Sequence, residues 1–383
     1  MSRERAGRNN RAKSIKQTGY TGGIDMYKDR LDKLRKLMRE KTLTQMIVAD
    51  TPSIFYLTGK WIDSGERLLV LLIREAGNPL LFVNELFPQE ETEGIDLVWI
   101  NDTSDSIGIL CGFTDKGKTL GIDKNWPSGF FLKLMGNQGG SDYVNSSLLL
   151  DSIRAQKDDA EVAFMREASK RNDEAMQQLI EAIDEDITEM EMEKILGEIY
   201  QNLGTDGFSF EPIIAYGKNG ADPHHFNGKR LLNEGDSIIL DIGCKKDNYC
   251  ADMTRTVFYR SVSDVAREVY ETVLLANETA IAMVRPGVKF KDIDLAARGV
   301  IEAKGYGKYF THRTGHSIGI EVHEYGDVSS SNEDLLKPGM IFSIEPGIYL
   351  EGEMGVRIED LILVTEDGYE NLNHYSKELK VVR

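Results

Sequence analysis

The stretch from Ser237 to Thr256, SIILDIGCKKDNYCADMTRT, places two aspartates inside what its pattern predicts to be one β-hairpin. An apolar run leads into Asp241, a polar turn follows, and a second strand-like run carries Asp252. Folding the stretch about the midpoint of Lys246 and Asp247 sets the two aspartates directly opposite each other, with Cβ atoms about 4.5–5.5 Å apart. Buried carboxylates at that distance repel, so we expect a positive group between them or a proton on one of them.

A second stretch of the same design lies further along the chain. Residues 340–364 read MIFSIEPGIYLEGEMGVRIEDLILV, and folding them about Gly352 sets Glu345 opposite Glu359. Either pair alone could be a turn flanked by solvated acids. Two pairs inside apolar strands indicate four oxygen ligands that converge on divalent metal, because Asp and Glu are seldom fully buried unless they are paired.

Composition limits the classes of partner. The chain has 383 residues, which suggests two or three domains, and a net charge of −17, which argues against nucleic acid as a partner. No apolar run is long enough to span a membrane, so no membrane association is expected. Three cysteines cannot all pair and show no Cys-x-x-Cys spacing, which indicates a reducing, cytoplasmic location: Cys111, Cys244 and Cys250.

The order of predicted elements divides the chain into three parts. Residues 1–23 carry six basic residues and one acid and are interpreted as a flexible basic arm. Residues 24–150 begin with an amphipathic helix and continue with short apolar strands between helices and loops, which predicts a small α/β domain. Residues 151–383 contain two long helices followed by a carboxylate hairpin, twice over. This order predicts a larger domain built from two similar halves.

Histidines gather in the same part of the chain as the acids. His316 lies between Gly315 and Gly319, whose small size allows close approach, and it is the best candidate for a nitrogen ligand. One imidazole among four carboxylates suits Mn, Co, Fe or Zn better than Ca. His316 and His323 are seven residues apart, so they would point to opposite faces of a regular strand, and a bulge or loop must intervene if both line the site.

These motifs resemble those of the pita-bread metallopeptidases, the group that includes methionine aminopeptidase, Xaa-Pro aminopeptidase and Xaa-Pro dipeptidase (prolidase). The matching stretches are LDIGCKKDNYCADMTRT, HRTGHSIGIEVHE, IEPGIY and GVRIED. The resemblance covers roughly residues 150–383, and the preceding domain resembles the N-terminal domain of creatinase and the proline-specific members. It implies an α+β architecture: a pita-bread catalytic domain with pseudo-twofold halves, preceded by a smaller α/β domain. Ser317 departs from the pattern, since Gly often follows the metal histidine.

The resemblance also implies a ligand set and further site residues. Two divalent ions, manganese first with cobalt, iron or zinc as alternatives, would lower the pKa of a water molecule enough to ionise it near neutral pH. Asp241 would hold one ion, Asp252 and Glu359 would bridge both, and His316 with Glu345 would complete the other. Glu345 would also transfer protons. The residues expected against the substrate or supporting the ligands are His323, His224 with His225 as its alternative, Arg357 and Thr254.

The activity that this resemblance implies is hydrolysis of the bond between an N-terminal residue and proline. We expect first an Xaa-Pro dipeptidase acting on short proline-containing peptides. An Xaa-Pro aminopeptidase acting on longer peptides is the alternative, because the chain length and the compact N-terminal domain fit either activity. Creatinase-type and non-enzymatic relatives lack the full ligand set, whereas all five positions are filled here. Methionine aminopeptidase lacks the N-terminal domain. The resemblance further implies a homodimer.

Overall fold

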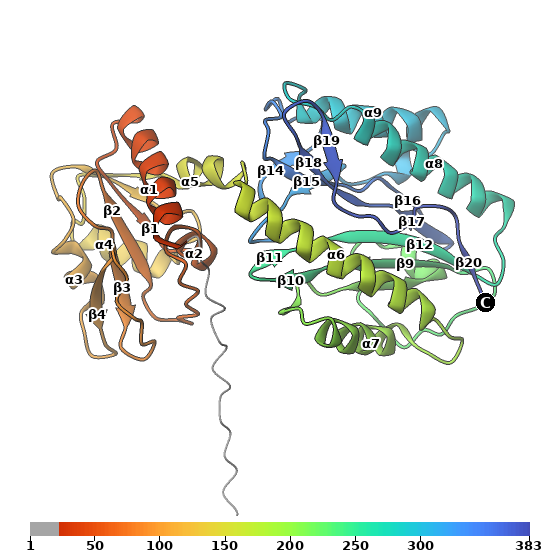
Figure 1. The fold of residues 1–383 in the computed structure, drawn as a ribbon, viewed down its shortest axis with the longest axis horizontal. Helices are drawn as coiled ribbons and strands as arrows, with labels where there is room; N and C mark the ends of the chain where they lie inside the picture. The colour runs from red at the N-terminus through yellow and green to blue at the C-terminus, as the bar shows by residue number, and fades with distance from the viewer. Residues whose placement is uncertain (1–22) are drawn as a thin grey trace, which may run out of the picture. The chain divides into compact units, whose positions relative to one another are not determined.

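A computed structural model describes residues 23–383 of the chain (Figure 1). These residues form two compact units, one made of residues up to 120 with 125–142, the other of residues 121–124 with 143–383. Apart from Gly23, the basic segment that we interpret as a flexible arm lies outside the described residues. Among residues 23–383, no helix is both long and apolar enough to cross a lipid bilayer.

The N-terminal part of the chain contains a six-stranded sheet in the order β4-β3-β2-β1-β5-β6. Its central strands are apolar runs whose side chains are almost all buried, as a sheet covered on both faces requires. The strands are β1 (Gln45–Val48), β2 (Val70–Arg74), β3 (Leu80–Asn84), β4 (Asp96–Ile100), β5 (Thr119–Ile122) and β6 (Asp142–Asn145). The helices are α1 (Gly23–Glu40), α2 (Thr51–Thr58), α3 (Ser106–Cys111), α4 (Ser128–Gly136) and α5 (Ser147–Arg154). The predicted α/β domain is confirmed.

The first half of the larger unit pairs two helices with a four-stranded sheet in the order β20-β12-β9-β8. Both helices begin at capping boxes, in which the N-cap and the third helical residue exchange hydrogen bonds: Asp158 with Glu161, and Thr188 with Glu191. The elements are α6 (Asp159–Glu181), α7 (Glu189–Asn202), β7 (Gly207–Phe208), β8 (Ile213–Tyr216), the 3₁₀ helix η1 (Gly217–Ala221), β9 (Ser237–Ile242), β10 (Cys244–Lys246), β11 (Tyr249–Cys250), β12 (Met253–Tyr259) and β20 (Val381–Val382).

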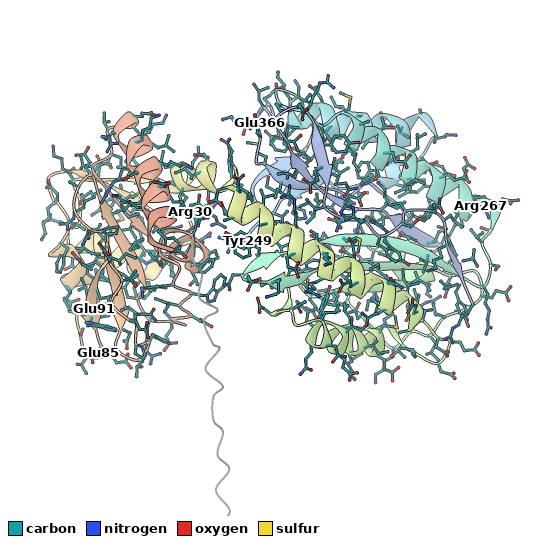
Figure 2. All side chains as sticks on the ribbon, in the orientation of Figure 1. Arg30, Glu85, Glu91, Tyr249, Arg267 and Glu366 are labelled. Carbon is teal, nitrogen blue, oxygen red and sulfur yellow. The ribbon has the colours of Figure 1, made fainter. Side chains whose placement is uncertain are left out.

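The second half repeats this plan with a five-stranded sheet in the order β14-β13-β15-β18-β19. Along α8, Val269 and Val273 are buried whereas Arg267 points outward, as an amphipathic helix on a sheet requires (Figure 2). The elements are α8 (Asp264–Ala282), α9 (Phe290–Ala303), η2 (Gly307–Tyr309), β13 (Gly315–Ser317), β14 (Glu324–Val328), β15 (Ile341–Ile344), β16 (Gly347–Leu350), β17 (Met354–Arg357), β18 (Asp360–Val364) and β19 (Tyr369–Asn371).

Each half has its own hydrophobic core. In the first, Met176 and Leu196 from the helices pack with Leu240 of β9. In the second, Val273 and Ile293 pack with Phe342 of β15. The strands of both sheets lie between the α6–α7 pair and the α8–α9 pair (Figure 1). The chain therefore has the predicted α+β architecture, a pita-bread domain with pseudo-twofold halves preceded by a smaller α/β domain.

The first carboxylate hairpin turns one residue later than its sequence pattern suggests. Asp247 and Asn248 form the turn, with φ values of 52° and 66°, and Lys246 pairs with Tyr249. Two successive residues with positive φ are the mark of a type I′ turn, which suits the twist of a two-residue hairpin. This register continues into β9 and β12, where Asp241 stands opposite Thr254. The predicted facing of Asp241 and Asp252 is therefore wrong by two residues.

The left-handed backbone at Asn248 predicts a specific sensitivity to substitution. Asn248→Val should destabilise the protein by about 1–2 kcal/mol, because a β-branched side chain clashes with the backbone in that conformation. Asn248→Gly is the control and should retain stability, since glycine adopts positive φ without steric cost. Urea unfolding of the metal-free protein measures both, and equal stability of the two variants would contradict the turn assignment.

Candidate metal centre

Asp241 and Asp252 come from the two long strands of the first hairpin. Asp241 lies in β9, and Asp252 directly precedes β12. Because Asp252 is two residues before Thr254, which pairs with Asp241, the two aspartates are diagonal neighbours on one face of the sheet. Diagonal neighbours remain within reach of each other's side chains. The corrected register thus keeps both carboxylates on the same face.

In the second hairpin, Glu345 and Glu359 lie between two pairs of antiparallel strands, β15 with β18 and β16 with β17. Ile344 pairs with Asp360 on one side, and Gly347 pairs with Arg357 on the other. Both pairs have the register predicted from the turn at Gly352. The backbone N–H of Glu345 donates to Thr314 O at 2.7 Å, and that of Glu359 donates to Thr254 O at 3.1 Å. The second contact joins the two hairpins.

His316 enters this group from β13. A Cβ on Gly315 would lie 1.9 Å from Ser343 O, so only glycine allows β13 to approach β15 this closely. The Nε2 atom of His316 is 3.6 Å from Asp252 Oδ2 and 3.5 Å from Glu345 Oε1. Asp252, His316 and Glu359 each offer one ligand atom, and these three atoms all lie within 4.8 Å of one another.

The buried carboxylates favour their protonated forms in the absence of metal. Burial raises the pKa of Asp252 and that of Glu359 well above their ordinary values, and neighbouring carboxylates raise both further. Burial likewise raises the pKa of Glu345 to about 7. Burial lowers the pKa of His316 to about 3, so its imidazole is neutral and can act as a ligand.

The oxygens of this cluster fit a bound cation. Asp241 Oδ1, Asp252 Oδ1 and Glu359 Oε1 are buried and accept no hydrogen bond from any described residue. A buried acceptor without a partner costs free energy that a cation would recover. Carboxylate oxygens combined with one imidazole nitrogen form a donor set for Mn, Co, Fe or Zn.

Arg357 and Thr254 link ligand candidates of the two hairpins. Arg357 Nη2 donates to Asp241 Oδ2 at 2.6 Å, and its Nε donates to Thr254 Oγ1 at 3.2 Å. Thr254 Oγ1 in turn donates to Glu359 Oε2 at 2.7 Å. This chain of hydrogen bonds fixes one oxygen of each carboxylate and leaves the other oxygen free.

The remaining histidines occupy different surroundings. A register shift after His316 and the loop that follows bring His323 back to it, with ring centroids 4.2 Å apart. Burial lowers the pKa of His323, and the nearby positive charge of Arg313 and that of His224 lower it further. His225 instead contacts Glu189 Oε2 on α7 at 2.9 Å. Of the two neighbouring histidines, His225 is therefore the one held against α7.

Sequence reasoning did not select His312, Tyr349 or Ser343. His312 Nε2 lies 2.8 Å from the hydroxyl of Tyr349, which also accepts a hydrogen bond from Arg357 Nη1 at 3.0 Å. Ser343 Oγ donates to Glu345 Oε1 at 3.2 Å and accepts from the His316 N–H at 3.0 Å. The available signal was spacing: Ser343 lies two residues before Glu345, and His312 four before His316.

A buried ionic cluster holds the loop that carries His323. Glu324, which follows it, accepts from Arg154 Nη2 at 2.7 Å and from Lys157 Nζ at 2.9 Å. Arg154 also donates to Glu321 at 2.8 Å. Burial opposes ionisation of Glu324, but Lys157 and Arg154 outweigh it and hold its pKa at about 2.

The low pKa of Glu324 predicts acid sensitivity. The Glu324 carboxyl has a lower pKa in the folded protein than in the unfolded chain, where its pKa is near 4.5. Ionised Glu324 therefore stabilises the fold above pH 4.5, and this stabilisation is lost as the pH falls toward 2. Glu324→Gln should therefore cost roughly 3 kcal/mol at pH 7, and the cost should shrink at pH 3. Urea unfolding at both pH values measures it. Glu321→Gln is the control and should cost below about 1 kcal/mol, since Glu321 is 35% exposed. Equal costs for both variants would contradict this account.

The fold and the site together define a class of protein. A two-half domain gathers buried carboxylates and a neutral imidazole around oxygens that lack partners, and a separate α/β unit precedes it. This combination is that of a metal-dependent hydrolase.

The chain belongs to metallopeptidase family M24. The model of that family matches residues 163–366, and the creatinase/prolidase N-terminal domain matches residues 30–156. The chain is therefore a peptidase, and the complete candidate ligand set lies inside the matched range.

Three similar proteins illustrate the relationship. An uncharacterised peptidase of Staphylococcus aureus is 35% identical over 91% of this chain and 100% of its own length. A prolidase from Thermococcus sibiricus is 35% identical with a TM-score of 0.86, covering 93% of this chain and 99% of the other. An X-Pro aminopeptidase from Thermotoga maritima is 29% identical with a TM-score of 0.80, covering 91% of this chain and 100% of the other.

Proposed function

We propose that the protein is an Xaa-Pro dipeptidase that cleaves short proline-containing peptides. The observation that carries the proposal is the buried cluster of four carboxylates and His316, with three oxygens lacking partners. The similarity to the Thermococcus sibiricus prolidase across both units supports the choice of substrate. We further propose that residues 24–150 and 151–383 act as the two domains, that the protein is a homodimer and that it is cytoplasmic.

Five side chains would hold the metal ions: Asp241, Asp252, His316, Glu345 and Glu359. Asp252 and Glu359 would be shared ligands in this proposal, and manganese would be the first choice of metal, with cobalt, iron and zinc as alternatives. When bound, the ions supply Lewis-acid polarisation of the scissile carbonyl and ionise water near neutral pH.

The chain's own residues then position the substrate and move protons. Glu345 takes a proton from the attacking water and delivers it to the leaving nitrogen of proline. His323, beside His316, and His224 are proposed to donate hydrogen bonds to the substrate and to the tetrahedral intermediate. Arg357 orients Asp241 through the 2.6 Å contact between its Nη2 and Asp241 Oδ2. Thr254 orients Glu359 through the hydrogen bond that its Oγ1 donates to Glu359 Oε2 at 2.7 Å.

The alternative function is an Xaa-Pro aminopeptidase that acts on longer peptides. The observation that favours it is the similarity to the Thermotoga maritima enzyme across 91% of this chain. The two activities differ in whether the site accepts residues beyond proline. Ala-Pro and Ala-Pro-Ala, assayed with metal-stripped protein and Mn²⁺ added back, separate them. Cleavage of Ala-Pro alone supports the dipeptidase, preference for Ala-Pro-Ala supports the aminopeptidase, and cleavage of neither contradicts both.

Replacing one bridging ligand tests the metal centre. Asp252→Asn should lower kcat/KM for Ala-Pro by at least about a thousandfold and reduce bound Mn²⁺ from two equivalents per chain, because the amide carries no charge. Elemental analysis and the peptide assay measure these effects. Asp367→Asn, at an exposed position of the same unit, is the control and should change neither. Full activity of Asp252→Asn would exclude the proposed centre.

The raised pKa values predict how metal stabilisation depends on pH. Asp252, Glu359 and Glu345, the last with a pKa of about 7, hold protons when folded that the unfolded chain releases at lower pH. Their contribution to the stability of the metal-free protein therefore falls as pH rises from about 4.5 to 7. Mn²⁺ competes with those protons, so its effect on Tm should be small at pH 5 and large at pH 7.5. Thermal unfolding with and without Mn²⁺ measures this, and a shift independent of pH would contradict it.

A further inference from the structure

The segment that follows β19 forms hydrogen bonds with the backbone of metal ligand candidates and of residues close to them in the chain. We name residues 372–377 the strap. Asn373 Oδ1 accepts from the Leu361 N–H at 2.6 Å, while its Nδ2 donates to Asp252 O at 3.2 Å. A single buried side chain thus binds β18 and the backbone of a ligand candidate in the other hairpin.

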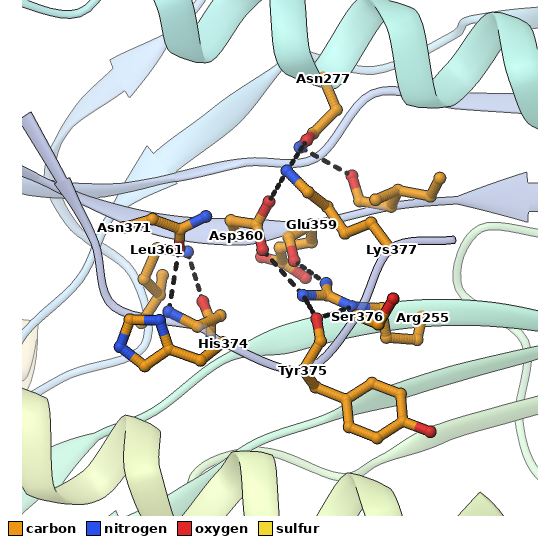
Figure 3. Close-up of polar contacts among 12 residues, drawn as sticks. Arg255, Asn277, Glu359, Asp360, Leu361, Asn371, His374, Tyr375, Ser376 and Lys377 are labelled. Atoms are coloured by element: carbon orange, nitrogen blue, oxygen red, sulfur yellow. Dashed lines mark hydrogen bonds and ion pairs between the residues drawn. The ribbon is translucent and has the colours of Figure 1, made fainter. Parts of the chain in front are cut away.

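Arg255 connects the strap to both hairpins. Its Nη2 donates to Tyr375 O in the strap at 2.8 Å and to Asp360 Oδ1 at 2.9 Å. Its Nη1 donates to Thr254 O at 2.9 Å and to Glu359 O (Figure 3). Arg255 is 2% exposed, so its planar guanidinium holds these backbone groups at fixed relative positions away from water.

Lys377 completes the network from the strap. Its Nζ donates to Asp360 Oδ2 at 2.7 Å and to Asn277 Oδ1 at 2.7 Å (Figure 3). Asn277 lies on α8 and connects Lys377 to the backbone of the second hairpin. Its Nδ2 donates to Ile344 O at 2.9 Å and to Ile358 O at 3.4 Å. These two carbonyls directly precede Glu345 and Glu359.

The network therefore reaches three ligand candidates through the backbone. It touches Asp252 and Glu359 at their own carbonyls, and Glu345 at the residue before it. Both oxygens of the fully buried Asp360 are paired with cations. A buried ionic network that satisfies every charge is rigid, and removal of one member leaves an uncompensated group.

We propose that the strap positions the metal ligands, with Lys377 and Asn373 as its positioning residues. This inference rests on the proposed function, because it presumes that Asp252, Glu345 and Glu359 hold metal. The strap would act by holding the backbones of the two hairpins at the separation that lets the carboxylates converge, without touching the substrate or the ions.

Lys377→Met tests the inference, since methionine keeps the apolar stem and removes the ammonium group. Isothermal titration of the metal-stripped full-length chain with Mn²⁺ should show the weaker ion bound about tenfold less tightly, within the range for loss of a residue that orients ligands. The absorption spectrum of the Co²⁺-loaded variant should shift, because it reports ligand geometry. Asn373→Ser is the second variant and should change both readouts in the same direction.

Lys380→Met, three residues beyond the strap, is the matched control. Lys380 is exposed and contacts the hydroxyl of Tyr375 at 3.2 Å, so its loss should change neither the affinity nor the spectrum. A lower Tm for Lys377→Met with parental Mn²⁺ affinity and Co²⁺ spectrum would overturn the inference and leave a stabilising role alone. Tighter Mn²⁺ binding would also overturn it, because charge removal would then outweigh positioning.

The parent protein separates this inference from the proposed function. If the parent binds two equivalents of Mn²⁺ and cleaves Ala-Pro while both strap variants bind Mn²⁺ as the parent does, only the inference fails. If the parent itself binds no Mn²⁺, the proposed metal centre is wrong and the inference falls with it.

Discussion

The mutual repulsion of four carboxylates, three of them buried and one partly buried, is the constraint on which the catalytic unit depends. Asp241, Asp252, Glu345 and Glu359 share one site, where burial and repulsion between carboxylates oppose the ionisation of Asp252, Glu345 and Glu359. A fold that keeps them together needs strong scaffolding and an opposing positive charge. Arg357 supplies part of that charge within the chain itself, at 2.6 Å from Asp241.

The two halves of the unit divide the ligand candidates between them. The first half supplies Asp241 and Asp252, and the second supplies His316, Glu345 and Glu359. Each half has its own main hydrophobic core, although Phe258 of β12 packs into the core of the second half, and the site lies where the two halves meet. Contacts that cross between the halves, including the hydrogen bond from Thr254 to Glu359, therefore determine whether the ligand set is complete.

Much of this arrangement could be predicted from local sequence. The order of apolar segments indicated an α/β domain followed by two helix-and-hairpin halves, and the symmetric spacing about Gly352 gave the second hairpin its correct register. The first hairpin could not be placed as well, because polarity alone does not show whether Lys246 or Asn248 shares the turn with Asp247. Contacts between distant segments, such as Arg154 with Glu324, were beyond prediction since neither residue carries a local signal of its partner.

The way in which each carboxylate is held has a consequence for the choice of ion. One oxygen of Asp241 is engaged by Arg357, one of Glu359 by Thr254, and one of Glu345 by Ser343. Side chains restrained in this way offer single oxygens rather than chelating pairs. Calcium, which needs six to eight oxygens and often uses both oxygens of a carboxylate, would be left undercoordinated. In the proposed metal centre, the hydrogen bonds that order the site would therefore also favour ions of low coordination number over calcium.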